Sequence, residues 1–334
     1  QKEAYKEICA KNISLDMSRG KPGPDQLDLS MDMLDVFNSK SELKSENGFD
    51  CRNYGVMDGI PEAKKLMADI MGTKPENVIV YGNAESGKET FISTMVYDII
   101  TTYSVQEAQM YLMDFGSEAL KIFKSAPHIG DVVLGSDSEK ISRLFDMIQK
   151  EMKRRTELLS NYGGDIKLFI KDTGEPMPQI IIVINNYEGF VENYGEKYDD
   201  ILLTLCREGI KYGIIFVLTA SAYNSVRYRL SQNFKQKIAL QLNNEDDYLN
   251  IIEGIRKQRP AHMFGRGLIK YGDIYEFQTA RICEPEKWNA FIKDKIAQLN
   301  EKYTEKAEPI PVLPNQVKVE DIKELVQSLN KLPV

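Results

Sequence analysis

The chain has 334 residues, of which 42% are hydrophobic and 28% are charged, and its formal net charge at pH 7 is −7. The apolar share is sufficient for a packed core and excludes disorder as the main state, while the length is typical of about two domains. The negative charge argues against a surface that wraps nucleic acid, so we do not expect a nucleic acid partner. A local basic face is the alternative, at Lys150, Lys153, Arg154 and Arg155.

The cysteines and histidines are too scattered to predict a metal site or a redox motif. They are Cys9, Cys51, Cys206, Cys283, His128 and His262. Because they form no C-x-x-C or H-E-x-x-H pattern, we expect no metal site and a reducing, intracellular setting. The longest apolar run, at residues 180–184, is far shorter than the roughly 18 residues of a membrane-spanning helix, so we expect a soluble chain.

The first 77 residues differ from the rest and predict a separate N-terminal segment. A loop rich in glycine and proline at 17–24 precedes an apolar periodic stretch at 27–37 and a polar stretch at 38–47. Pro61 and Gly72 are suited to the first turn and the C-terminal cap of a helix that runs to about residue 70. The sequence therefore predicts a helix-rich N-terminal fragment at 1–77.

From residue 78 onward, short apolar strands alternate with amphipathic helices. The expected strands cover residues 78–81, 109–113, 131–134, 179–184, 214–219 and 236–242. The expected helices cover residues 88–102, 137–162, 199–211, 245–253 and 285–306. This alternation predicts an α/β domain with a mostly parallel sheet at 78–308. Three prolines then indicate an extended linker, and Glu320 begins a helix that the chain end interrupts, so 309–334 is expected to lead into a following element.

The stretch from Gly82 to Lys88 fits the phosphate-binding pattern G-x-x-x-x-G-K, between an expected strand and an expected helix. The glycines allow backbone N–H groups to surround a phosphate at the helix N-terminus, and the lysine would reach the terminal phosphates. The predicted nucleotide-binding residues are Gly82, Asn83, Ala84, Glu85, Ser86, Gly87, Lys88, Glu89 and Thr90. The alternative is a glycine-rich turn with a surface lysine.

The positions that would bind Mg²⁺ and activate water are changed. Glu89 stands where the pattern has a Ser or Thr hydroxyl, and Thr90 lies about 100° further round the helix and cannot replace it. The strand at 179–184 ends in Asn185 and Asn186, where a nucleotide hydrolase has acids that hold the metal and orient the attacking water. We therefore expect ATP binding with little contribution from Mg²⁺, and weak or no hydrolysis. Alternatively, the asparagines simply end a buried strand.

From about residue 80 to residue 314, the sequence resembles an ATPase domain of the FtsK/SpoIIIE family, specifically of the multidomain, membrane-anchored ATPase of type VII secretion systems. The matching stretches, in family order, are YGNAESGKETF, YLMDFG, EMKRRTELLSNYG, IIVINNY, IIFVLTAS, FKQKIALQ and FGRGLIK. The resemblance implies a RecA-like P-loop NTPase fold at the cytoplasmic face of the cell membrane. It also implies neighbouring ATPase domains of the same parent protein and secreted proteins as partners.

The resemblance further implies that three catalytic positions are lost together, at Glu89, Asn185 and Asn186. We therefore predict a degenerate, regulatory or substrate-binding ATPase domain. The first alternative is an active ATP-hydrolysing motor domain in which Asp114 or Glu188 supplies the missing acid. The arginines that could contact a neighbouring domain, or simply lie in solvent, are Arg154, Arg155, Arg227, Arg229 and Arg266.

Residues 1–84 resemble the N-terminal part of a class I pyridoxal-phosphate-dependent aminotransferase, in the stretches LDMSRGKPGP, RNYGVMDGIPEAKKL and KPENVIVYGNA. In that family the Schiff-base lysine, the acid at the pyridinium nitrogen and the substrate arginine lie further along the chain, and none can be assigned here. Pyridoxal phosphate is therefore not expected, and an aminotransferase is the second alternative function. We interpret the join near residues 78–84 as a truncated fusion or an artefact of two joined reading frames.

Overall fold

In the computed structural model, residues 76–312 are described continuously, together with residues 6, 10, 41, 43–45, 48 and 50–52. The chain divides into two units, Gln1–Thr73 and Lys74–Val334. In the first unit, the described positions include an isolated antiparallel bridge between Lys44 and Asp50. The expected loop at 17–24, the apolar periodic stretch at 27–37 and the helices expected near residue 70 and after residue 320 lie outside the described residues.

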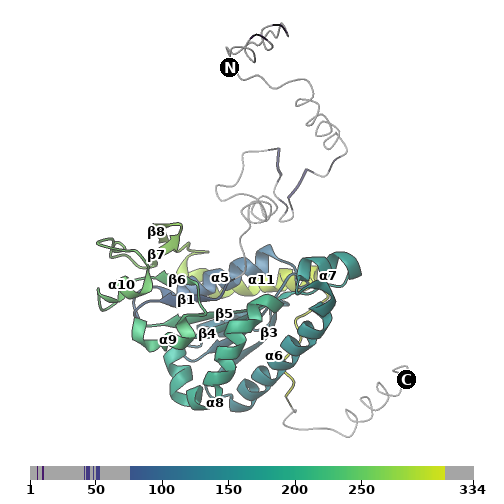
Figure 1. The fold of residues 1–334 in the computed structure, drawn as a ribbon, viewed down its shortest axis with the longest axis horizontal. Coiled ribbons are helices and arrows are strands. Elements are labelled where there is room, and N and C mark those ends of the chain that lie inside the picture. The colour runs from purple at the N-terminus through teal and green to yellow at the C-terminus, as the bar shows by residue number, and fades with distance from the viewer. Residues whose placement is uncertain are drawn as a thin grey trace. The chain divides into compact units, whose positions relative to one another are not determined.

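The second unit is built on one eight-stranded sheet (Figure 1). Its strands are β1 (Val78–Tyr81), β2 (Ala108–Asp114), β3 (Ile129–Leu134), β4 (Gln179–Asn185), β5 (Ile214–Ala220), β6 (Gln236–Ala239), β7 (Arg266–Tyr271) and β8 (Asp273–Gln278). They lie in the order β3-β2-β4-β5-β1-β6-β7-β8. Strands β1 to β6 pair in parallel, whereas β7 and β8 add an antiparallel hairpin at one end. The prediction of an α/β fold with a mostly parallel sheet is confirmed.

Helices cover both faces of this sheet (Figure 1). Helices α5 (Lys88–Thr102) and α11 (Trp288–Lys302) pack on one face, and α6 (Ser138–Leu159) and α8 (Tyr187–Glu208) pack on the other. The shorter helices are α7 (Ile166–Thr173), α9 (Tyr228–Ser231) and α10 (Asp247–Ile251). Single 3-10 turns lie at Ala119–Phe123, Ser160–Tyr162, Gly209–Tyr212, Tyr223–Ser225 and Pro285–Lys287. None of the described helices is long and apolar enough to cross a membrane.

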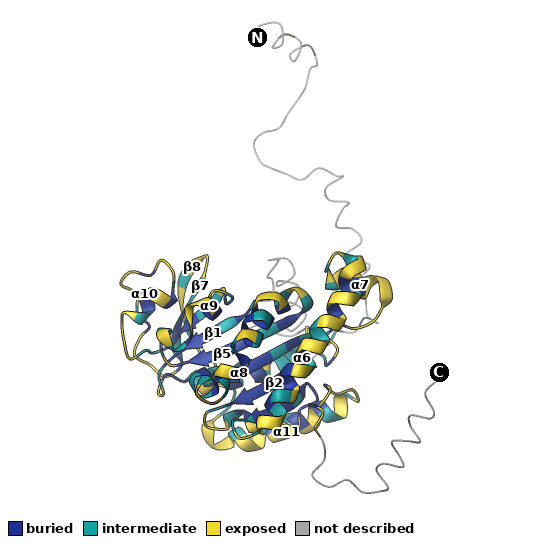
Figure 2. Cartoon of the chain, turned by 60° about the horizontal axis from the view of Figure 1, so that its bottom comes forward, coloured by how far each residue is buried: buried dark blue, intermediate teal, exposed yellow. Residues whose placement is uncertain are grey.

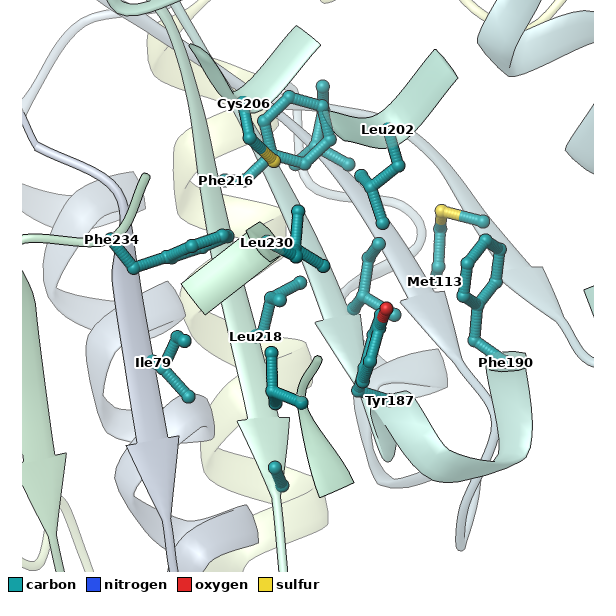
Figure 3. Packing of buried hydrophobic residues seen from close by; sticks show 14 of the residues in the cluster. Ile79, Met113, Tyr187, Phe190, Leu202, Cys206, Phe216, Leu218, Leu230 and Phe234 are labelled. Carbon is teal, nitrogen blue, oxygen red and sulfur yellow. The ribbon is translucent and has the colours of Figure 1, made fainter. Parts of the chain in front are cut away.

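The two faces of the sheet are buried in two separate hydrophobic clusters. Figure 2 shows the strands of the sheet as mostly buried and the helices as partly exposed. Along β4, Ile180, Ile182 and Ile184 enter the cluster under α6 and α8, whereas Val183 enters the cluster under α5 and α11. Neighbouring side chains of a strand point to opposite faces, so a strand covered on both sides needs an unbroken apolar run. Figure 3 shows part of the first cluster, in which Phe190 of α8 lies with Met113 of β2 and with Phe216 and Leu218 of β5.

Several elements differ from the sequence-based prediction. Helix α8 begins at Tyr187 and not near residue 199, because Tyr187, Phe190 and Tyr198 are buried at helical spacing despite two glycines in that stretch. Helices α7 and α9 and the β7–β8 hairpin were not predicted. The residues of β8 are mostly exposed, so that strand lacks the apolar alternation by which a half-buried strand is recognised.

The expected linker begins as part of the domain. Ala307 donates its backbone N–H to Pro127 O (2.8 Å), and the Tyr111 hydroxyl donates to Glu308 O (2.7 Å). Ile310 is only 3% exposed and joins the cluster under α6 and α8. The segment at 305–310, hereafter the strap, therefore stays packed against the sheet after α11 has ended.

Candidate functional site

The predicted phosphate loop lies at the edge where the parallel strands end. Gly82 directly follows β1. The adjacent strand β5 ends in Ala220, and β4, on the far side of β5, ends in Asn185. In the register of the sheet, Asp114 of β2 is paired with Asn185. Ligands of open α/β sheets bind outside the carboxyl ends of the strands. This carboxyl edge therefore brings the residues predicted from three distant stretches together.

Backbone hydrogen bonds fix the shape of the phosphate loop. Gly82 N donates to Ala220 O (2.9 Å) and Asn83 N donates to Gln241 O (2.7 Å), which ties the loop to both neighbouring strands. The Ser86 hydroxyl donates to Asn83 O (2.8 Å), and Glu85 N donates to the Asn83 side-chain oxygen (3.1 Å). The loop is therefore held in place by contacts within the domain.

Gly87 connects this loop to α5 and allows a close approach of another segment. Its φ of 84° lies in the left-handed region, and a Cβ at this position would lie 2.9 Å from Gly265 N. Gly265 N donates to Ser86 O (2.9 Å), so the segment before β7 rests directly on the phosphate loop. Any side chain at residue 87 would force these two segments apart.

A cavity of about 250 Å³ lies at the N-terminus of α5. It is lined by Ala84, Gly87, Lys88, Glu89, Thr90, Gly116, Asn185, Asn186 and Phe264. A second hollow of about 380 Å³ shares Glu89, Thr90 and Phe264 with it and adds mainly apolar lining, including Ile282 and Trp288. The first hollow has the position and backbone donors that suit phosphate groups, and the second can receive an apolar ring.

Lys88 is folded back onto its own loop. Its Nζ donates to Gly82 O at 2.8 Å. Burial lowers the pKa of Lys88, and the carboxylates of Glu188 and Glu89 partly oppose that shift. The lysine is therefore a half-buried cation at the cavity, with its charge favoured by two nearby acids.

Glu89 is also held by a neighbouring segment. The Ser117 hydroxyl donates to Glu89 Oε1 at 2.6 Å, across the loop that follows β2. The carboxylate consequently borders the cavity at the position where the phosphate-loop pattern has a metal-binding hydroxyl. Thr90 lines the same cavity but lies one residue further along α5.

Asn185 makes hydrogen bonds with both of its side-chain polar atoms. Its Nδ2 donates to Asp114 Oδ1 (3.0 Å), and its Oδ1 accepts from the Thr219 hydroxyl (2.8 Å). Asp114 and Asn185 are each 2% exposed, and Thr219 is fully buried. Asp114 also accepts from Gly116 N (3.0 Å) and Leu120 N (3.1 Å). The alternative in which Asp114 supplies the missing acid stays a prediction; in this conformation its carboxylate is buried and accepts from three donors.

Asn186 and Glu188 begin α8 at the same edge. Asn186 has a φ of 60°, and its Nδ2 donates to Phe115 O at 2.9 Å. Glu188 Oε1 accepts from Ser221 N (2.6 Å) and from the Ser221 hydroxyl, whereas its buried Oε2 has no hydrogen-bond partner among the described residues. Burial alone would raise the pKa of Glu188, but the hydrogen bonds from Ser221 help to lower it overall. Glu188 is therefore an ionised acid close enough to influence Lys88.

The site has the features that bind phosphate, whereas the positions of the usual metal-binding groups are changed. The loop presents a helix N-terminus, a lysine and a cavity, which are the features that bind phosphate. For a metal, the hydroxyl is replaced by Glu89 and the polar atoms of Asn185 are already bonded. In the part of the chain that the structure describes, no group of three or more His, Cys, Asp or Glu side chains could hold a metal ion.

The candidate arginines lie elsewhere and differ in their surroundings. Arg155 is 1% exposed and donates to Glu151 Oε1 (2.7 Å) and Tyr212 O (2.8 Å), so it cannot reach a neighbouring domain. Arg154 shares Glu151, and Arg227 forms an ion pair with Asp199. Arg266 Nε lies 3.7 Å from Glu276 Oε1. Arg229 has no ion pair with any residue that the structure describes. Arg155 is therefore a structural residue of the domain core.

Sequence reasoning missed three residues of this site. Ser117 and Thr219 act through hydrogen bonds to residues 28 and 34 positions away, which no local pattern reveals. Phe264 is 57% exposed and borders both hollows. The only sequence signal for it is its place in the stretch FGRGLIK, directly before Gly265.

The sequence profile of the FtsK/SpoIIIE family matches residues 53–280. The type VII secretion system protein EssC of Staphylococcus aureus (strain MRSA252) is 28% identical over 273 residues, which cover 78% of this chain and 18% of that protein. The chain thus spans less than a fifth of that relative's length. These matches support the ATPase resemblance and do not support the aminotransferase resemblance of residues 1–84, most of which lie outside the described residues.

Solved structures give the same result for the fold. A structure of EssC (ATPases 2 and 3) from Geobacillus thermodenitrificans superimposes with a TM-score of 0.69 at 25% identity, covering 75% of this chain and 49% of that one. Thermomonospora curvata EccC (ATPases 2 and 3), in complex with a signal sequence peptide, gives a TM-score of 0.61 at 24% identity, covering 74% and 46%. The domain thus has the fold of P-loop ATPases of this kind.

Proposed function

Because the chain belongs to the FtsK/SpoIIIE family, we propose that it serves as one ATPase domain of a type VII secretion ATPase. In this role its nucleotide site binds ATP with little help from Mg²⁺ and hydrolyses it weakly or not at all. The observation that carries the proposal is the cavity at the N-terminus of α5, where Lys88 is kept but Glu89, Asn185 and Asn186 stand at the metal and water positions.

The two hollows divide the nucleotide between them. The phosphates lie at Gly87 and Lys88 in the smaller cavity, and the base and sugar extend past Thr90 towards Phe264 and Trp288. An aromatic side chain that is already exposed, such as Phe264, can pack on a ring without first leaving the core.

Outside the nucleotide site, the proposal makes the domain regulatory or substrate-binding. Its partners are neighbouring ATPase domains of the same parent protein and secreted proteins, and its place is the cytoplasmic face of the membrane. The support comes from the similarity to EssC and to EccC, of which the latter was solved with a signal sequence peptide.

A thermal-shift titration of the full chain with ATP, with and without Mg²⁺, tests the nucleotide site. A ligand that binds only the folded state raises the melting temperature in proportion to its saturation. We expect a shift with ATP alone, no more than a small increase with Mg²⁺, and no shift in Lys88→Ala. Lys211→Ala, an exposed lysine at the opposite edge, is the matched control and keeps the shift.

Phosphate release measures hydrolysis in the same variants. We expect a rate equal to that of Lys88→Ala, because no side chain at the end of β4 supplies an acid. Turnover that Lys88→Ala removes, or a shift of several degrees that requires Mg²⁺, would contradict the proposal.

The second candidate function is an active motor domain, and the environment of Glu188 is the observation that favours it. Its buried Oε2 lacks a partner among the described residues, and its charge reaches Lys88. If the chain hydrolyses ATP, Glu188→Gln should reduce the rate by roughly 100-fold or more, as expected when a general base is lost. Glu192→Gln, one turn further along α8, is its control.

A further inference from the structure

We propose that the cavity between α6 and the strap, hereafter the strap cavity, binds a small organic anion with one or two acidic groups and an apolar body. The strap cavity has a volume of about 690 Å³. It shares no lining residue with the two hollows beside the phosphate loop. Its ligand is therefore separate from the proposed nucleotide, and this inference does not depend on nucleotide binding.

Three parts of the domain form the walls of the strap cavity. One wall is a side of α6, the second is the start of β2 and β4 near Gln109 and Pro178, and the third is the strap with Pro311 directly after it. Figure 1 shows the strap passing beside α6, in agreement with the cavity that they share. The volume lies within the range of about 300 to 1,000 Å³ that is typical of pockets for small molecules.

A buried guanidinium lines this cavity with one nitrogen unused. Arg155 is 1% exposed. Its Nε donates to Glu151 Oε1 (2.7 Å) and its Nη1 donates to Tyr212 O (2.8 Å), whereas Nη2 has no hydrogen-bond partner among the residues that the structure describes. A buried donor without an acceptor is destabilising, and more so when it carries a charge. An anionic oxygen in the strap cavity would supply the acceptor for Nη2.

The ion pair of Arg155 leaves positive charge in excess. Glu151 also accepts from Arg154, through Nε (2.7 Å) and Nη2 (2.8 Å), so one carboxylate serves two guanidinium groups. Burial lowers the pKa of Arg155, and the hydrogen bond to Glu151 opposes that shift without cancelling it. The surroundings of Arg155 therefore do not replace the hydration that its charge has lost, and a further anion would stabilise it.

Cations outnumber acids in the lining of the whole cavity. The five cationic side chains are Arg143, Lys150, Arg154, Arg155 and Lys306. The three acidic side chains are Asp146, Glu151 and Glu308. Lys150 of α6 and Lys306 of the strap have no ion pair within the part of the chain that the structure describes. Five cations against three acids leave an excess of two positive charges, in a chain whose net charge is −7.

This contrast with the rest of the chain limits the ligand to a small anion. A long polyanion such as a nucleic acid would extend beyond the strap cavity over a negatively charged protein and would be repelled there. A ligand with one or two acidic groups matches the local excess of charge and stays inside the cavity.

The remaining lining indicates the body of the ligand. Met147, Pro178 and Pro311 line the cavity and are at least partly exposed. The Tyr111 ring lies there as well, but its hydroxyl already donates to Glu308 O (2.7 Å), so this residue offers its ring rather than a donor. Covering these surfaces favours an apolar or aromatic body beside the acidic group.

The strap is held in place by contacts within the domain. Ala307 N donates to Pro127 O (2.8 Å), and the strap comes close to β3 at Gly130, where a Cβ would lie 2.6 Å from Glu308 O. These contacts keep Lys306 and Pro311 at the cavity. The site is therefore formed in advance, which reduces the entropy lost on binding.

The test is a fluorescence titration of the full chain with anilinonaphthalenesulfonate, an organic anion with an aromatic body. We expect saturable binding to the wild-type chain. Phenylnaphthylamine has the same rings without the sulfonate and should bind about tenfold more weakly or worse, because it offers no acceptor to the cations. Inorganic sulfate has the charge without the rings and should also bind about tenfold more weakly or worse.

Pairs of exposed residues locate the probe. Lys150→Ala should weaken binding about threefold, and together with Lys306→Ala about tenfold. Lys153→Ala, on the same helix but outside the lining, should leave affinity unchanged. Pro311→Glu adds a negative charge at the cavity and should weaken binding about threefold, whereas Pro309→Glu adds it outside the lining and should not.

The nucleotide site provides the remaining control. Lys88→Ala should leave probe affinity unchanged, and Lys150→Ala should keep the ATP-induced thermal shift. Absence of saturable binding, equal affinity for phenylnaphthylamine, or equal affinities of Lys150→Ala and Lys153→Ala would overturn the inference. A loss in Lys88→Ala as large as in Lys150→Ala would also overturn it, because the probe would then occupy the nucleotide site. Probe binding as expected without any ATP-induced shift would contradict the proposed function alone.

Discussion

Polar side chains are buried at both ends of the parallel strands, but the two edges use them differently. At the amino edge, Asn77 accepts from Phe216 N (2.8 Å) and donates to Cys206 O (2.7 Å), and Arg155 donates to Glu151 and Tyr212. At the carboxyl edge, Asp114 and Asn185 also bind each other, but Lys88 and Glu89 border an open cavity.

The two edges of one sheet thus have different roles: the amino edge stabilises the domain, and the carboxyl edge also presents residues to the cavity at the N-terminus of α5. At the amino edge, where the parallel strands begin, the buried polar side chains form hydrogen bonds with backbone atoms. The strap packs there through Ala307 and Ile310. At the carboxyl edge, an inner layer formed by Asp114, Asn185 and Thr219 is fully hydrogen-bonded. An outer layer of loop residues that line the cavity stays accessible to a ligand. Substitutions at the amino edge should therefore change stability, and those in the outer layer should change ligand binding.

The largest expected effect comes from Arg155→Met at the amino edge. Removing this buried guanidinium leaves Tyr212 O without its donor, and we expect a loss of about 3 kcal/mol in unfolding free energy. Arg154→Met is the matched control, because Arg154 shares Glu151 but is 57% exposed, and should cost about 1 kcal/mol or less. Urea unfolding of both variants measures the difference. Equal losses of unfolding free energy in the two variants would contradict the expectation that the burial of Arg155 makes its removal more destabilising.

The next effect concerns the path of the strap. A Cβ on Gly130 would lie 2.6 Å from Glu308 O and 2.3 Å from the Tyr111 ring. Gly130→Ala should therefore displace the strap and cost about 1 to 3 kcal/mol, as for overpacking in a core. Gly163→Ala is the converse case: it meets no atom within 4 Å, but the φ of 63° at that position strains an alanine, so its cost is backbone strain without overpacking. The ATP-induced thermal shift should survive in Gly130→Ala; its loss would show that the two edges are coupled.

A smaller effect is expected from pH at the amino edge. Burial lowers the pKa of His128 below its usual 6.5, and the nearby Lys302 acts in the same direction, while the bond to Tyr103 O and the charge of Glu107 oppose it. The unfolded chain then binds the proton more readily, so stability is present above about pH 6.5 and is lost as pH falls towards the folded pKa. The slope from this group cannot exceed about 1.4 kcal/mol per pH unit.

Urea unfolding between pH 7.5 and pH 5 measures that slope in the wild-type chain and in His128→Gln. Glutamine can keep a donor towards Tyr103 O but does not titrate, so its profile should be flatter. An unchanged slope in the variant would assign the pH dependence to other groups.

The smallest effect on stability is expected in the outer layer of the carboxyl edge. Phe264 is 57% exposed, so Phe264→Ala should change the unfolding free energy by less than about 0.5 kcal/mol. If the ring packs on the base of the nucleotide, the same variant should weaken ATP binding by about 1 kcal/mol, measured by titration calorimetry. Met263→Ala removes a neighbouring exposed side chain that lines neither hollow and should leave affinity unchanged.

The sequence by itself determined the parallel α/β pattern and the phosphate loop, because both depend on local signals. The run of apolar residues in β4 must be buried on two faces, and Gly82 to Lys88 must turn between a strand and a helix. The first half of α8 escaped prediction because its two glycines hide the helical spacing of Tyr187 and Phe190.

Only the tertiary structure decided what the changed catalytic positions do. The sequence shows two asparagines after β4, but the parallel register places Asn185 beside Asp114, which lies 71 residues away. Hydrogen bonds of this kind depend on atoms that meet only after the sheet has formed, so no local pattern encodes them. The same reason explains why Ser117 and Phe264 joined the site only through the folded chain.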